Sequence, residues 1–420
     1  MGRYSSFIFS DYSGGLNTTS SNREIARNEA SFLRNWDVTR MGELRRRDGL
    51  VQTGDTIANE IESMGTLVRT AGNDIVLKED VNLRYLNGTT WDALDNGFTA
   101  DTPLWFTSFA LTQSLFMGSE DDTTHYWDRT STTLNSCLTD LGAAVPHGNV
   151  YRDWHNHLFV ANNVTVSGTS YPNRVYWSDL ADPTTWDTAN DFIEVGGAGR
   201  VIALAELGDV LVIWKEHAVQ YLSGWGDTDW RITATTSSLQ NIDESVGIAG
   251  ARAHTRVGNE IWYLDDEGII RRLYQTPEFD AFRRDIVSTK IRGTLETINK
   301  TQMSQAVMTT FDDKVYCAVP TGAATTNNTV LVFDILASRR TESEAWTTYT
   351  GWSPSDFAVH FTGSTPNLYV GDVGVGKVYR HAGDDDDGVS ITARWDAKRD
   401  DYDAPDSYKW YNWGEIEAGV

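Results

Sequence analysis

A short apolar run recurs seven times along the chain, at residues 75–77, 115–117, 158–160, 210–213, 261–264, 315–318 and 368–370. The starts of these runs lie 40, 43, 52, 51, 54 and 53 residues apart. Spacing this regular over about 300 residues is typical of a repeat architecture. The repeat therefore restricts the fold more strongly than composition does.

Each run has a partner that indicates a β-hairpin. A second apolar or aromatic position lies 10 to 12 residues after the start of five runs, at Tyr85, Tyr126, Tyr221, Leu273 and Tyr379. Turn-forming residues lie between the two positions, for example at 265–268 and 371–374. A third apolar segment precedes each run and a fourth follows most of them. Four short strands per unit are typical of a propeller blade.

We therefore predict an all-β fold, a β-propeller of about seven four-stranded blades with an N-terminal arm made of a helix and a hairpin. A β-sandwich, single or in tandem, also supplies short strands at similar spacing and stays the alternative. The predicted domains are an arm over residues 1–60, a propeller over 61–396 with a helical insertion at 276–301, and a C-terminal strand segment over 397–420.

Charge argues against one class of function. The chain has 59 acidic and 35 basic residues, a formal net charge of -24. Such a surface repels phosphate backbones, so tight nucleic-acid binding is disfavoured, although DNA could slide along an acidic channel without adhering. Cys137 and Cys317 lie in different repeats and offer no disulfide framework. No apolar leader or stretch of 18 apolar residues is present, so we expect neither standard secretion nor a membrane anchor.

The first 60 residues do not share the repeat. Ile25, Phe32, Leu33 and Trp36 lie at spacings that place them on one face of a helix, which Ser21 or Asn22 could cap. Residues 36–49 then predict a hairpin that turns at Met41 and Gly42.

Three segments of this arm carry a resemblance to a known family. Residues 9–16 (FSDYSGGL), 29–35 (EASFLRN) and 42–49 (GELRRRDG), with later segments at 282–292 and 391–399, resemble the tail hub or nozzle proteins of short-tailed bacteriophages. These are tail tubular, DNA-stabilisation type virion proteins that carry propeller repeats. The present chain is shorter than the proteins it resembles, which continue into further strands, so we expect an accessory domain to be absent or reduced.

The resemblance implies a structural virion protein without enzymatic activity. It implies a homo-oligomeric ring, a hexamer, that connects to a tail adaptor or portal-associated protein and to a tail fibre or needle protein. The ring would surround the DNA exit channel during DNA ejection, without binding DNA specifically. The expected location is the phage tail of the virion, and the host cytoplasm during assembly. Two other hypotheses stay open: a tail protein that binds or depolymerises host glycans, and a cellular propeller scaffold.

The candidate interface residues lie outside the repeats. Arg40, Arg45, Arg46 and Arg47 form a concentrated basic patch that is either paired internally with Glu43 and Asp48 or docks on an acidic neighbouring subunit. Trp36 and the C-terminal Trp410 and Trp413 are further candidates.

The insertion at 276–301 supplies the remaining candidates. Ser288 could cap a helix that places Ile291, Leu295 and Ile298 on one face. The propeller itself or a neighbour in the ring would cover this face.

No motif predicts a catalytic, cofactor-binding or metal site. Residues 371–378 match a phosphate loop up to Lys377, but Val378 follows where Ser or Thr is needed, so a hairpin turn is favoured. Asp384 to Asp387 lack the ligand spacing of a calcium loop, and His155 with His157 lack a third metal ligand. A pair of carboxylates suited to glycoside hydrolysis cannot be recognised from sequence alone.

Overall fold

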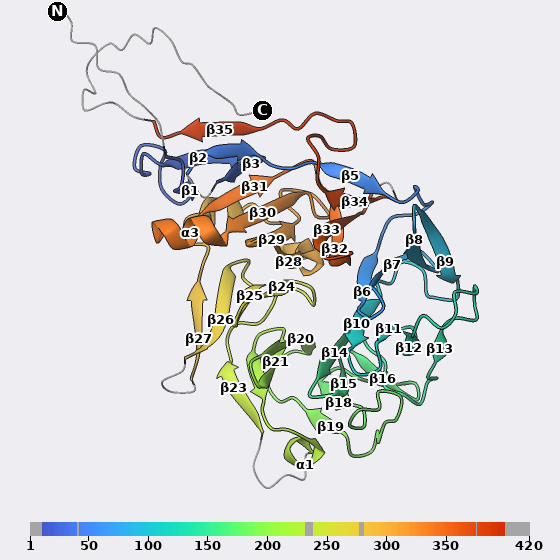
Figure 1. Cartoon of the computed structure of the whole chain (residues 1–420). Coiled ribbons are helices and arrows are strands. Elements are labelled where there is room, and N and C mark those ends of the chain that lie inside the picture. Colours follow the sequence, from blue (N-terminus) through green and yellow to red (C-terminus); the bar gives the residue numbers. More distant parts are fainter. Residues whose placement is uncertain (1–10, 40–41, 232–237, 277–280, 375, 400–420) are drawn as a thin grey trace, which may run out of the picture.

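Seven sheets follow one another around a ring in the computed structural model, which describes residues 11–39, 42–231, 238–276, 281–374 and 376–399 (Figure 1). Six of these sheets have four strands and one has seven. We call the four antiparallel strands that each sheet contributes to the ring a blade. The predicted all-β propeller is confirmed.

The strands of the first four blades are β6 to β9 (Ser63–Leu67, Asp74–Glu79, Asn82–Asn87, Thr90–Asp95), β10 to β13 (Trp105–Phe109, Ser114–Gly118, His125–Trp127, Thr139–Asp140), β14, β15, β18 and β19 (Val150–Trp154, His157–Ala161, Arg174–Trp177, Phe192–Glu194), and β20 to β23 (Val201–Leu207, Val210–Lys215, Val219–Leu222, Leu239–Asp243). A small hairpin, β16 and β17 (Val164–Val166, Thr169–Tyr171), lies between β15 and β18.

The remaining blades contain β24 to β27 (His254–Val257, Glu260–Leu264, Ile270–Thr276, Ala281–Ile286), β28 to β31 (Val307–Phe311, Lys314–Val319, Thr329–Asp334, Trp346–Tyr349), and β32 to β34 (Pro354–Thr362, Thr365–Asp372, Val378–His381) with β5 (Leu50–Thr53).

Each of the seven apolar runs lies in the second strand of its blade. In β11 and β15 every residue is buried. Neighbouring blades cover both faces of such a strand, so both sets of alternating side chains are apolar, and the strand reads as a continuous run. The repeated apolar runs that predicted the fold therefore result from packing between neighbouring blades.

The last blade is completed by a strand from the other end of the chain. β5 pairs antiparallel with β34, with Gln52 opposite Tyr379. The first strand of the same blade, β32, lies against β6 of the first blade. The segment 50–53, which the sequence placed in the arm, is thus the outer strand that closes the ring.

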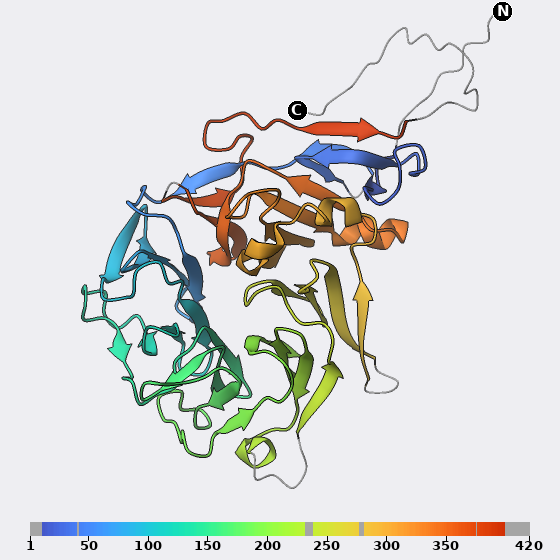
Figure 2. The same cartoon turned by 180° about the vertical axis from the view of Figure 1, so that it is seen from behind.

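The predicted helix of the arm is wrong. Glu29–Arg34 forms β2, which pairs in parallel with β1 (Gly15–Leu16) and β31 and antiparallel with β35 (Arg394–Ala397), as both views show (Figures 1 and 2). Without β2, the backbone groups of β31 would form an unpaired sheet edge. Hydrogen bonding to these edges stabilises a strand, although the apolar spacing also fits a helix.

The predicted hairpin that follows is confirmed. β3 (Trp36–Val38) pairs antiparallel with β4 (Leu44–Arg46). Gly42 adopts φ +82°, which favours glycine, and its N–H donates to the Thr39 carbonyl at 2.8 Å. Met41, the other predicted turn residue, lies outside the described residues.

The insertion contains less helix than predicted. β27 occupies much of it, and helix is confined to the single turn α2 (Arg292–Leu295) and the 3-10 helix η1 (Lys300–Gln305). Ser288 does not cap a helix; its hydroxyl instead donates to the Ile270 carbonyl at 3.2 Å. The other helices are α1 (Asp227–Trp230) and α3 (Ile335–Thr341). None of the helices in the described ranges is long and apolar enough to cross a bilayer.

The two faces of the ring follow from the strand directions. Neighbouring strands in a blade are antiparallel, so the connections between first and second and between third and fourth strands lie at one end. The connections between second and third strands, and the links between blades, lie at the other end. We call the former the Trp225 face, after a residue between β22 and β23, and the latter the pocket face.

Candidate functional site

A pocket of about 590 Å³ opens on the pocket face. Its walls come from blade-to-blade links, which supply Arg200 and residues 248–251, and from hairpin turns, which supply Glu216, His217 and Asp266. Residues 300–304 of η1 close another side. The pocket is therefore shared by several consecutive blades.

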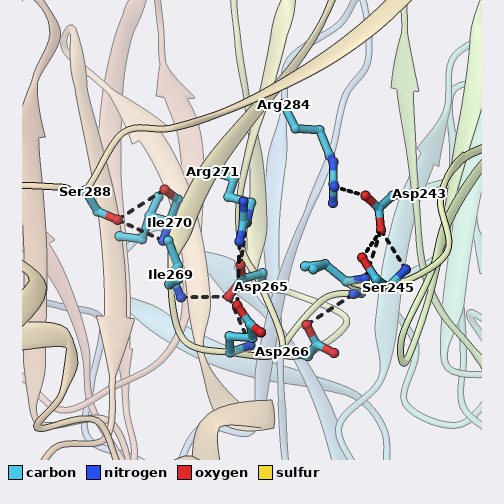
Figure 3. A network of polar contacts seen from close by, with 12 residues as sticks. Asp243, Ser245, Asp265, Asp266, Ile269, Ile270, Arg271, Arg284 and Ser288 are labelled. Atoms are coloured by element: carbon cyan, nitrogen blue, oxygen red, sulfur yellow. Dashed lines mark hydrogen bonds and ion pairs between the residues drawn. The ribbon is translucent and has the colours of Figure 1, made fainter.

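The charged groups of the pocket are mostly paired. Arg200 Nε donates to Glu216 Oε1 at 3.2 Å, and both side chains are more than 40% exposed. His217 Nδ1 lies 2.8 Å from Asp266 Oδ2. The other oxygen of Asp266 accepts the backbone N–H of Gly247 at 3.2 Å (Figure 3). Exposed pairs contribute little stability, so these groups are available for recognition.

A buried polar network holds Asp266 in place (Figure 3). Its neighbour Asp265 accepts the N–H of Ile269 at 2.7 Å and of Glu267 at 3.0 Å, and Arg271 Nε at 2.5 Å. Burial raises the pKa of Asp265, while the hydrogen bond from Arg271 lowers it. The turn 265–269 is thereby tied to its own strand.

The link on the other side of Asp266 is fixed in a similar way. Asp243 Oδ1 accepts the N–H of Ser245 at 2.6 Å and of Val246 at 3.0 Å, and Asp243 Oδ2 binds Arg284 (Figure 3). This link leads to Gly247, which donates to Asp266. The pocket wall is therefore preorganised.

Two further groups suit the pocket for polar contacts. Asn162 is 6% exposed and its Nδ2 donates to the Ile202 carbonyl at 3.1 Å, whereas its Oδ1 has no hydrogen-bond partner among the described residues. Lys300, which is exposed, also lines the pocket and brings a positive charge to it. A buried acceptor without a partner costs free energy, which a hydrogen-bond donor of a ligand would relieve.

Lys215 anchors the link that carries Arg200. Its ammonium is buried and donates to the carbonyls of Val195, Gly196 and Gly197 at 3.0, 3.0 and 2.8 Å. Burial lowers the pKa of Lys215. Lys78, near the end of the second strand of another blade, is buried too and binds Glu62 in the link before its own blade.

The arginines predicted as an interface are held by the chain itself. Arg47 is 1% exposed and binds Asp386, while its guanidinium lies over the Trp352 ring at 5.1 Å. Arg45 pairs with Asp48 at 2.6 Å, and Arg46 donates to the Asp384 carbonyl at 2.8 Å. This is the internal pairing that the sequence left open as one alternative. Arg40 lies outside the described residues.

The remaining predicted interface residues are covered by the chain itself or lie outside the described residues. Ile291, Leu295 and Ile298 are 0%, 6% and 5% exposed and belong to the core of this chain, so the propeller itself covers them. Trp36 is half-buried and packs on the same core. Trp410 and Trp413 lie outside the described residues.

The motifs weighed for chemistry have structural roles. His155 and Asn156 form the turn between β14 and β15 with positive φ, so His155 and His157 do not lie along one extended strand. The turn 372–377 joins β33 to β34, as a hairpin turn was predicted to do. Asp386 and Asp387 bind Arg47 and Lys377. Within the described ranges, no three His, Cys, Asp or Glu side chains form a metal-binding group.

The Trp225 face carries a feature that sequence reasoning missed. Ten large apolar side chains are exposed among the described residues, and seven of them lie in or beside the connections of this face: Val68, Leu111, Leu134, Leu180, Trp225, Leu336 and Phe361. The pocket itself contains none of the ten. One signal was available, because Trp225 stands between Gly224 and Gly226, in a segment that cannot pack as a strand.

Comparison with known proteins identifies relatives by fold only. No protein-family model matches the chain, and no curated protein matches its sequence. Among solved structures, the β-propeller domain of Cps50 (Swd1) from Myceliophteria thermophila is 10% identical with a TM-score of 0.51, over 79% of this chain and 99% of that domain. This likeness supports a propeller and nothing finer.

Two further structures are similar over comparable lengths. Raptor from Chaetomium thermophilum is 13% identical with a TM-score of 0.49, over 80% of this chain, which spans 29% of Raptor. The WD40 propeller domain of Doa1 is 10% identical with a TM-score of 0.48, over 79% of this chain and 96% of that one.

The resemblance to phage tail hub proteins is wrong. The propeller that the chain matches belongs to a cellular protein and not to a virion component. The virion ring, its portal, adaptor, fibre and needle partners, the DNA exit channel and the virion location all rested on that resemblance and are corrected with it. Of the segments that carried it, 29–35 contains strand β2, which pairs with β31, and 42–49 contains the second strand of the β3–β4 hairpin. Short turns and arginine-rich hairpins of this kind are individually common and do not identify a family.

Proposed function

We propose that the protein is a non-enzymatic propeller scaffold that binds a partner protein through its Trp225 face. The observation that carries this proposal is that seven of the ten exposed large apolar side chains of the described residues lie at that face, three of them on adjoining blades. Exposed apolar groups that gather on one surface mark interaction sites, whereas single scattered ones need no explanation.

Part of this surface lies on three consecutive blades. Val68 follows β6, Leu111 lies between β10 and β11, and Phe361 lies near the end of β32, with exposures of 53%, 56% and 46%. β6 contacts both β10 and β32. The N–H of Val68 donates to Ser108 Oγ at 3.1 Å, which ties two of these corners together. A partner would therefore meet a rigid surface, which lowers the entropy cost of association.

The pocket supports the scaffold reading in a second way. Its two carboxylates, Glu216 and Asp266, each bind a cationic or neutral nitrogen partner, which suits recognition by hydrogen bonds. The orphan Oδ1 of Asn162 offers an acceptor to a polar group. We therefore assign the pocket face a secondary binding role and no catalytic step.

Affinity capture from the native source, with quantitative mass spectrometry, tests the proposal. We expect a reproducible partner with the wild-type protein that is lost in Leu111→Glu and Phe361→Glu. Val389→Glu is the matched control, because Val389 is 67% exposed and lies outside this face. Thermal melts should show all three variants folded. A partner retained by both face variants, or no partner at all, contradicts the proposal.

A further inference from the structure

Trp225 is the most exposed of the large apolar side chains in the described residues, at 70%. It lies in the connection between β22 and α1, and its backbone N–H donates to Asp229 Oδ2 at 2.9 Å. Its ring stacks on His155 with centroids 4.3 Å apart and planes 11° apart. One face of the indole is therefore covered by His155.

The stack continues into the core. His155 lies on Trp154 at 4.2 Å and 22°, and Trp154 lies on Trp230 at 5.1 Å and 29°. Trp230 is 1% exposed, and its Nε1 donates to the Ser223 carbonyl at 3.1 Å. His155 also lies 6.3 Å from Trp230, so these three rings form a compact cluster that holds Trp225 against a buried anchor. An indole held in this way loses little conformational entropy when something binds its outer face.

Several carboxylates lie near this ring cluster. Asp209, from the turn between β20 and β21, and Glu206, near the end of β20, lie close enough to His155 to act on its charge. Glu206 faces Arg256 at 3.8 Å, while Asp209 and Asp229 form no ion pair with a cation among the described residues. Asp227 faces Arg231 at 3.9 Å. The surface next to Trp225 therefore keeps negative charge.

The imidazole of His155 does not repel a cation. Burial lowers the pKa of His155, against the pull of Asp209 and Glu206, so the ring is neutral at pH 7. A neutral imidazole beneath the indole leaves the negative face potential of Trp225 intact. The face of tryptophan attracts cations more strongly than that of any other side chain.

We propose that the Trp225–His155 stack binds a lysine or arginine side chain in a basic segment of a partner protein. The cation would lie over the free face of Trp225, with the carboxylates of Asp209 and Asp229 beside it. The acidic surroundings favour a cation over an apolar ring, and a sugar hydroxyl would gain hydrogen bonds from them but no charge attraction. This inference rests on the proposed scaffold function and names the partner chemistry for one site on the same face.

The test follows Trp225 directly. Protein labelled with 5-fluorotryptophan is titrated with the peptide (Arg-Gly)4 and followed by fluorine NMR, with the Trp225 signal assigned by its loss in Trp225→Phe. We expect this signal to move with (Arg-Gly)4 and to stay in place with (Gln-Gly)4. A signal that moves only with a neutral oligosaccharide such as cellopentaose, or with neither peptide, overturns the inference.

Binding of a fluorescein-labelled (Arg-Gly)4 adds a quantitative readout. Trp225→Ala should weaken the affinity about 3- to 10-fold, Trp225→Phe less, and Asp209→Asn should weaken it and reduce its salt dependence. Leu180→Ala is the matched control on the same face, since Leu180 is 62% exposed and is not part of the stack. Equal affinity for wild type and Trp225→Ala would mean that only general charge attraction holds the peptide.

The outcomes separate the two proposals. If partner capture depends on Leu111 and Phe361 but the Trp225 signal does not move with the basic peptide, the scaffold function is supported and this inference is wrong. A Trp225 signal that responds to the basic peptide, without any captured partner, removes the scaffold function and leaves binding of a cation at Trp225.

Discussion

Arg47 and Asp386 form a two-pronged ion pair across 339 positions of the chain, with Nη1 to Oδ1 at 2.8 Å and Nη2 to Oδ2 at 2.6 Å. The Arg47 side chain is fully buried and also donates to Asn35 Oδ1 and to the Thr350 carbonyl. This pair joins the segment before β5 to the segment after β34. It therefore secures the point where the two ends of the ring meet.

Removing one partner of this pair should open the closure. We expect Arg47→Ala to lower the free energy of unfolding by about 3 to 5 kcal/mol, because the Asp386 carboxylate would lose its cation inside the protein. Urea unfolding measures this change. Arg45→Ala is the control, since its pair with Asp48 is exposed and should contribute less than about 1 kcal/mol. Similar losses in both variants would contradict a special role for Arg47.

Gly49 should be intolerant of any side chain. A Cβ at this position would lie 1.9 Å from the Asp385 carbonyl oxygen, a backbone atom that cannot rotate away. We expect Gly49→Ala to lower the unfolding free energy by about 1 to 3 kcal/mol through overpacking. Gly196→Ala, where a Cβ would meet nothing within 4 Å, should change it far less. Thermal denaturation of the two variants, side by side, decides the matter.

His254 should make stability fall in mild acid. Its Nδ1 is out of contact with solvent, and burial, helped by Arg152, lowers its pKa to about 4. The unfolded value is about 6.5, so the unfolded chain binds the proton more readily in between. The stability that the neutral ring contributes is present above pH 6.5 and is lost as the pH falls toward 4.

Replacing the ring should flatten this dependence. In His254→Gln we expect the loss of unfolding free energy between pH 6.5 and 4.5 to be smaller than in wild type by about 2 kcal/mol. Urea titrations at several pH values measure the slope. Parallel slopes in the two proteins would show that other groups cause the acid sensitivity.

Lys215 should control the order of the pocket wall. Lys215→Met keeps the length of the side chain but leaves the carbonyls of Val195, Gly196 and Gly197 without their donor. We expect faster hydrogen exchange in residues 195–201, while amides of the Trp225 face stay unchanged. Lys377→Met, which removes a partly exposed pair with Asp387, is the control. Unchanged exchange at 195–201 would show that the link holds itself.

Much of the fold could be read from the sequence because the second strands are covered on both faces. Burial on both faces requires apolar residues at consecutive positions, as in 210–213. The spacing of these runs can be recognised in the sequence without knowing which blades cover each strand. The arm could not be read in this way. Its apolar positions fit a helix, and only the edges of β31 and β35 select the strand β2.

The candidate site was less accessible to sequence reasoning. Arg45, Arg46 and Arg47 are equivalent in the sequence, yet one is buried on Asp386 and the others are exposed, because burial depends on a segment more than 300 positions away. The pocket likewise joins residues from links and turns of several blades. The turn-forming residues at 265–268 predicted a connection between two strands, but they did not indicate which residues lie opposite it in the pocket.

By itself, the sequence determined the all-β class, the repeat, the second strand of every blade and the acidic charge, since each depends on local pattern or composition. Only the tertiary structure decided how the ring closes, which arginine becomes buried, and which tryptophan of the described residues stands exposed over rings that reach into the core. These features depend on contacts between distant segments. Local periodicity indicates that a residue is buried, but it does not indicate which residues cover it.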